Sequence, residues 1–192
     1  MLARLYKIDT AIITPRTVIR RFREGEGNAF YRLVSDNRDR LREVLPQTID
    51  TVPTKKEAEG YVRRKIAAWL CQEEFCFGVW ENESAQLIGY VKIFHIDWSV
   101  PSADITFFID KEYEGKGLMT EVVRKLLRFA FEQLSIEKIR LRTAMDNYAT
   151  QRLARKCGLR REGDLRSEYR RPSGELVDVM LFGYTKTEYE KV

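Results

Sequence analysis

The chain has 192 residues, of which 44% are hydrophobic and 33% are charged. This is enough apolar material for the core of one domain, and such a composition excludes a disordered chain. The net charge is +5, but the 34 basic residues are interspersed with 29 acidic ones along the whole chain, which argues against a dedicated nucleic-acid-binding protein.

The first half of the chain predicts one strand, two helical regions and a meander of strands. Thr54, with Glu57 three residues later, predicts the capping box of a helix. The apolar face of that helix is expected to contain Ala58, Tyr61, Val62, Ile66, Trp69 and Leu70. The expected elements are a strand at 17–22, one or two short helices at 25–45 that end at Pro46, the helix from Thr54, and antiparallel strands at 75–80, 86–96 and 104–109.

The segment 102–131 is the centre of the chain. A β-branched and aromatic run, 105–109, is followed by Gly115-Lys-Gly and then by an amphipathic helix. Its apolar positions are Met119, Val122, Val123, Leu126, Leu127, Ala130 and Leu134. A strand that passes through glycines into a helix leaves the first-turn N–H groups free, so this loop predicts a phosphate site.

Taken alone, the glycine pair is also compatible with a plain tight turn. It is not a dinucleotide fingerprint, because Thr120 stands where the third glycine would fall. It is not a P-loop either, because Leu118 follows Gly117.

The last third of the chain predicts two more strand regions around a short helix. Residues 138–143 alternate in polarity and predict a strand. Its residues 139–143 should be parallel neighbours of 105–109, because a helix connects the two. Residues 147–159 predict a helix whose inward side chains are Ala149, Leu153, Ala154 and Cys157. A hairpin of 165–171 and 176–184 is expected to close the chain.

The cysteines and the histidine exclude two kinds of site. The three cysteines lack a Cys-x-x-Cys pair and His95 is the one histidine, so neither a zinc site nor a disulfide framework is predicted. No apolar run approaches the roughly 18 residues that span a bilayer. We expect a soluble, cytoplasmic protein without a membrane or DNA partner.

Several motifs, in this order, resemble the GNAT superfamily of acetyl-CoA-dependent N-acetyltransferases, and most closely the branch that acetylates ribosomal-protein N-termini. The motifs are Thr14-Pro-Arg with Ile19-Arg20, Gly115-Lys-Gly-Leu-Met-Thr-Glu, Asn147-x-x-Thr150, Lys156-Cys-Gly-Leu, and Glu162-Gly-Asp-Leu-Arg with Asp178. The resemblance implies one mixed α/β (α+β) domain over 1–192, with a family-like core at about 14–188. Its sheet should be mixed but mostly antiparallel, with six to seven strands that splay at one parallel pair and helices on its flanks.

The resemblance also implies acetyl-CoA as co-substrate and no metal. The implied cofactor-binding residues are Phe107, Phe108, Ile109, Glu114, Gly115, Lys116, Gly117, Leu118, Met119, Thr120, Asn147 and Lys156. Glu114 places a carboxylate where the family motif has a neutral or basic residue, and Lys116 is a candidate to offset it. Asn147 is equally well interpreted as a helix N-cap.

Three residues are candidates for catalysis. By resemblance, Thr150 should hydrogen-bond the thiolate, although a local bond within the helix is an alternative role. Asp104 is the first candidate for the general base, with a surface carboxylate as its alternative, and Glu168 is the second. Cys76 and Cys157 have apolar neighbours and are interpreted as core residues, so direct attack in a ternary complex is expected.

The acceptor is an amine, and the resemblance points to a protein N-terminus such as that of a ribosomal protein. The alternatives are a small-molecule amine (a polyamine, an amino acid or an aminoglycoside), a non-catalytic acyl-CoA-binding module and an RNA-binding protein of the ribosome. A monomer or a homodimer is expected. Arginines in and beside the closing hairpin predict a preference for acidic peptides, namely Arg160, Arg161, Arg166, Arg170 and Arg171.

Overall fold

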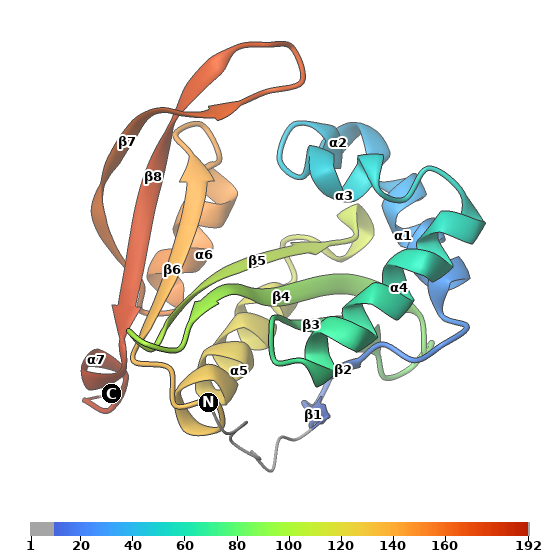
Figure 1. Cartoon of the computed structure of the whole chain (residues 1–192), viewed down its shortest axis with the longest axis horizontal. Coiled ribbons are helices and arrows are strands. Elements are labelled where there is room, and N and C mark those ends of the chain that lie inside the picture. The colour runs from blue at the N-terminus through green and yellow to red at the C-terminus, as the bar shows by residue number, and fades with distance from the viewer. Residues whose placement is uncertain (1–9, 192) are drawn as a thin grey trace.

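The computed structural model describes residues 10–191, which form one eight-stranded sheet with helices on both faces (Figure 1). The strand order is β1-β2-β3-β4-β5-β6-β8-β7. The bounds are β1 Ala11–Ile13, β2 Thr17–Arg21, β3 Phe75–Glu81, β4 Leu87–Asp97, β5 Ser102–Ile109, β6 Lys138–Ala144, β7 Arg160–Arg170 and β8 Leu176–Thr185. This confirms the predicted fold class, with one strand more than expected. The additional strand is β1, which lies before the first predicted strand and pairs antiparallel with β2.

The helices lie between the strands along the chain. They are α1 Gly27–Asp36, α2 Arg38–Arg42, α3 Pro46–Asp50, α4 Lys55–Leu70, α5 Leu118–Glu132, α6 Tyr148–Lys156 and α7 Lys186–Tyr189, with a 3₁₀ turn, η1, at Lys111–Tyr113. Within the part of the chain that the structure describes, no helix is both long and apolar enough to cross a bilayer.

Two hydrophobic cores lie on opposite faces of the sheet because successive strand residues point to opposite sides. Phe75 and Phe77 of β3 pack in the core that contains α5, where both rings contact Phe129. Cys76, between them, faces the second core, which contains side chains of α1 and α4. The central strands are therefore covered on both faces, and Leu118 and Met119 anchor the first turn of α5 in the core on its own face.

The parallel pair β5 and β6 meets at one end only. The strands are paired from Ser102 with Lys138 to Asp104 with Arg140, and they separate beyond that point. The predicted parallel direction and the splay are confirmed, but the expected pairing of 105–109 with 139–143 is wrong. β5 follows β4 as far as Ile109, whereas β6 follows β8 as far as Ala144, so each strand stays with its antiparallel partner.

Three local expectations also need correction. The helix before Pro46 already ends at Arg42, and Pro46 instead begins α3, where its missing N–H is harmless. Leu70 is the last residue of α4 and is 69% exposed, because the next position round a helix from the buried Trp69 points away from the core. In α6, Gln151 is buried and Ala149 is exposed, because Gln151 donates to the carbonyl of Met145 in the loop before the helix.

Candidate active site

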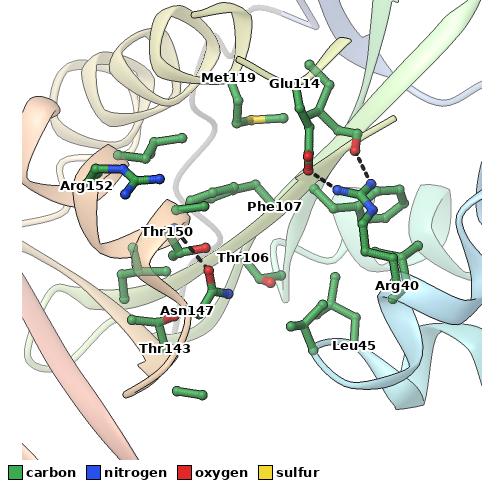
Figure 2. Close-up of a pocket in the computed structure, with 18 of the residues that line it drawn as sticks. Arg40, Leu45, Thr106, Phe107, Glu114, Met119, Thr143, Asn147, Thr150 and Arg152 are labelled. Carbon is green, nitrogen blue, oxygen red and sulfur yellow. Dashed lines mark hydrogen bonds and ion pairs between the residues drawn. The ribbon is translucent and has the colours of Figure 1, made fainter. Parts of the chain in front are cut away.

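A pocket opens where β5 and β6 part, between the β6–β8–β7 side of the sheet and α2 with residues 43–45 that follow it (Figures 1 and 2). Its cavity volume is about 930 Å³. Thirteen of the fifteen predicted site residues line it: Phe107, Phe108, Ile109, Glu114, Gly115, Gly117, Leu118, Met119, Thr120, Asn147, Thr150, Lys156 and Glu168. Asp104 and Lys116 do not.

One end of the pocket is formed by the glycine loop and the start of α5. Gly117 is the N-cap of α5 and has φ +76°, in the left-handed region where a β-branched residue is strained. The buried side chains of α5, among them Val122 and Leu126, hold the helix so that its first turn lines the pocket. Free first-turn N–H groups and the positive end of the helix dipole make this end suitable for a pyrophosphate.

A second, basic cavity of about 460 Å³ adjoins the loop and shares Gly117, Thr120 and Lys156 with the first. Arg16 lies in its wall, donates to the carbonyl of Lys116 at 2.9 Å and pairs with Glu121 at 2.8 Å. The sequence contained Arg16 in a family motif, but nothing in the motif indicated this contact. The side chain of Lys116 lies with Nζ 5.0 Å from the centre of the Tyr113 ring.

The opposite wall carries the Asn147-x-x-Thr150 motif. The side-chain oxygen of Asn147 accepts from the N–H of Thr150 at 3.1 Å, so Asn147 is the N-cap of α6. Both residues also line the pocket, and Figure 2 shows them on the wall opposite Arg40 and Leu45. The capping role is therefore present, while the contact with the cofactor arm remains a prediction.

Glu168 reaches the pocket because β7 is irregular at this point. The register between β7 and β8 shifts between Leu165 and Tyr169, and Ser167 has φ +50°. The N–H of Ser167 bonds to Oδ1 of Asp178 at 2.8 Å instead of to the β8 backbone. Such bulges redirect side chains beside active sites. Here Glu168 lies 3.4 Å from Nη1 of Arg142.

The carboxylate of Asp104 is buried and already paired with basic side chains, unlike a general base that is available to a substrate. It is 4% exposed, and its carboxylate accepts a hydrogen bond from Nε of Arg140 at 2.7 Å. Nδ1 of His95 lies 3.1 Å and Nη2 of Arg142 lies 4.0 Å from the same carboxylate. It points to the same face of the sheet as Thr106, which lines the pocket, but it lies nearer the paired end of β5 and β6. The base role of Asp104 stays a prediction, and this geometry favours Glu168.

The tip of the closing hairpin is bonded to the segment between α2 and α3. The Tyr169 hydroxyl donates to the carbonyl of Glu43 at 3.1 Å, and Arg171 lies 4.0 Å from the same residue's carboxylate. These residues all line the pocket, so they bridge its two walls. Neither Glu43 nor Tyr169 was predicted, because the contact joins residues 126 positions apart.

The arginines that predicted a strongly basic acceptor side are mostly paired. Arg160 pairs with Glu188 at 3.2 Å, and Arg161 forms an ion pair with Asp164. Arg171 is shared among Glu43, Asp146 and Glu175. The attraction for acidic peptides is therefore smaller than the sequence alone suggested.

The cysteines provide the first prediction. Burial raises the pKa of Cys76 to about 12 and that of Cys157 to about 11, so both thiols are almost fully protonated at neutral pH. Cys71 is exposed. We expect iodoacetamide at about pH 8 to modify only Cys71 in the folded protein and all three cysteines after denaturation, as measured by intact mass. A native adduct on Cys157 would contradict this burial.

Comparison with known proteins places this geometry in a family. The model of the acetyltransferase (GNAT) domain matches residues 16–160. "Probable N-acetyltransferase YjcK" of Bacillus subtilis is 34% identical over 68% of this chain and 73% of its own length. The spermidine N(1)-acetyltransferase of Vibrio cholerae is 32% identical over 46% of this chain and 51% of its own.

A solved structure of RimL, a ribosomal α-N-protein acetyltransferase in complex with coenzyme A, has the same fold. It superposes with a TM-score of 0.83 at 19% identity, over 91% of this chain and 96% of RimL. The glycine loop, the splayed strand pair and the pocket between them occur together in a chain that the family model matches over most of its length. The chain therefore belongs to the GNAT acetyltransferase family and is an acetyl-CoA-dependent N-acetyltransferase.

Proposed function

We propose that this enzyme acetylates a single amine at the end of a chain, a protein N-terminus such as that of a ribosomal protein, by direct attack in a ternary complex in the cytoplasm. The names of similar proteins include both a ribosomal acceptor and spermidine, and the pocket lining favours the first. The loop from Glu114 to Thr120 would hold the cofactor pyrophosphate, and Phe107 to Ile109 would pair with the pantetheine arm.

Two pocket residues would handle the protons of the transfer reaction. Glu168 would accept the proton of the attacking amine, directly or through one water, while Thr150 would donate to the departing sulfur. An α-amino group has a pKa near ~8 and is partly neutral at physiological pH, so a weak base suffices. Cys76 and Cys157 are not among the pocket residues, which supports transfer without an acetyl-cysteine.

The observation that carries the choice of acceptor is the pairing of the pocket's carboxylates. Glu43, Glu114, Asp146 and Glu168 are the acidic residues of its lining, and an arginine lies within 4.0 Å of each. A polyamine needs unpaired carboxylates for its several ammonium groups. An N-terminus brings one amine, and its first side chain can contact apolar residues such as Leu45 and Val179.

This proposal predicts an acceptor order that steady-state kinetics can measure. Free thiol release from acetyl-CoA is followed with a neutral N-terminal peptide, an acidic one, a basic one and spermidine, at low and high salt. We expect a higher kcat/KM for the neutral and acidic peptides than for spermidine, by about tenfold or more, because one uncompensated ammonium costs about that factor. The margin of the acidic over the basic peptide should shrink at high salt.

Two results would contradict the proposal. Spermidine as the best acceptor would reassign the enzyme to small-molecule amines. Binding of acetyl-CoA without thiol release for any acceptor amine would favour a non-catalytic acyl-CoA-binding module.

A further inference from the structure

The loop that should receive the pyrophosphate carries an acidic excess of its own. Between Asp110 and Gly117 the sequence has three carboxylates and two lysines, a net charge of −1. Glu114 is the carboxylate that lines the pocket, and Lys116 lies over the Tyr113 ring outside the lining. A carboxylate beside a pyrophosphate site opposes the ligand unless a cation neutralises it.

That cation comes from another part of the chain. Arg40 of α2 donates through Nη1 to the carboxylate of Glu114, and it lines the same pocket (Figure 2). Its other terminal nitrogen donates to the carbonyl of Ile109, the last residue of β5. Figure 2 shows Arg40 reaching from the α2 side of the pocket toward Glu114.

A buried asparagine fixes the position of Arg40. Asn37 is 3% exposed, and its side-chain oxygen accepts from Arg40 at 2.8 Å and from the N–H of Lys111 at 3.0 Å. Its amide nitrogen donates to Asp110 at 2.8 Å and to the carbonyl of Leu33 at 2.9 Å. All of the hydrogen-bonding groups of the amide are used, so the α1–α2 junction is clamped to the cofactor loop.

We infer that Arg40 is a positioning residue for the cofactor: it neutralises Glu114 so that the pyrophosphate of acetyl-CoA can enter the loop. The basic or neutral group expected at the Glu114 position is thus supplied from 74 residues away. The segment after Arg40, Glu43 to Leu45, lines the acceptor side of the pocket. The inference rests on acetyl-CoA use and is independent of which amine is the acceptor.

Neutralisation and simple structural support predict different results for the partner residue. If Arg40 cancels the charge of Glu114, then Arg40→Ala should weaken binding of CoA, whereas Glu114→Gln should leave it no weaker than wild type. The double variant should recover most of the loss, because the offending carboxylate is gone. If the ion pair only supports the fold, both single variants should lose affinity and the double variant should recover nothing.

The experiment is calorimetric titration of CoA into the wild type and these three variants at low and high salt. We expect Arg40→Ala to raise the dissociation constant about tenfold at low salt and by less at high salt, and the double variant to return to within about threefold of wild type. Arg40→Lys keeps the positive charge beside Glu114 and should therefore retain most of the affinity. Arg42→Ala, an exposed position on the same helix outside the pocket, is the matched control and should bind as wild type.

Thermal unfolding of each variant without CoA separates binding from folding. Equal losses in Arg40→Ala and Glu114→Gln, without recovery in the double variant, would overturn the inference. So would wild-type affinity in Arg40→Ala. A wild-type protein that bound no CoA would instead remove the cofactor assignment itself.

Discussion

Replacing Gly117 with valine is expected to raise the dissociation constant of CoA about 100-fold or more. The valine would have to adopt φ +76°, and its branched side chain, with Cβ 4.0 Å from Nη2 of Arg16, would hinder close approach of a ligand to the loop backbone. Losing two hydrogen bonds to a charged ligand, at about 1.5 kcal/mol each, gives about 3 kcal/mol, or roughly 100-fold. Calorimetric titration of CoA measures the change.

Gly25→Val is the matched control for this variant. Gly25 has φ +87° and no atom within 4 Å of an added Cβ, so it imposes the same backbone strain without lining the pocket. We expect both variants to lose about 1–2 kcal/mol of stability and only Gly117→Val to lose CoA. If both bind CoA like the wild type, the glycine turn serves the chain path and not the ligand.

Replacing Thr150 with valine is expected to lower kcat about 100-fold and to change the KM for acetyl-CoA little. Valine keeps the shape of threonine but removes the hydroxyl that should donate to the sulfur as the thiolate leaves. The N–H of residue 150 would still bond to Asn147, so α6 should keep its N-cap. Steady-state thiol release, with the best acceptor from the panel, gives both constants.

Thr150→Ser tests whether the hydroxyl is responsible. Serine restores the hydroxyl without the methyl group and should return kcat to within about threefold of wild type, since the donor is the same group. A valine variant with the wild-type kcat would leave Thr150 with a local role in the helix. A serine variant as slow as the valine variant would point to packing of the methyl group instead.

Much of the fold was predictable because its signals are local. The amphipathic pattern of α5, the Thr54 cap of α4 and the alternation of β6 each arise within a few residues, and the structure has all three. β1 was missed because three residues before Pro15 carry too short a pattern to be distinguished from a loop. The register of β5 against β6 was wrong because pairing depends on which neighbours each strand follows.

The candidate site shows the same difference between residues that local motifs predict and residues that depend on strand pairing. The glycine loop and the Asn147 cap are short motifs, and the structure brings both to one pocket. Glu168 was a candidate by its place in the chain, but the bulge that directs it depends on Asp178 of the neighbouring strand. No periodicity indicates such a bulge, since it is defined by the pairing of two strands.

What the sequence determined by itself was the family, the cofactor end of the pocket and the order of most elements, because motifs and periodicity are carried by neighbouring residues. Only the tertiary structure decided how charges are compensated. From the sequence, the negative charge of Glu114 is expected to oppose phosphate binding, but in the fold Glu114 is paired with Arg40. From the sequence, Arg171 is expected to be an unpaired cation, but in the fold it is shared among three carboxylates. An ion pair depends on distance in space, and the chain path that sets this distance is fixed by the packing of the whole sheet and its helices.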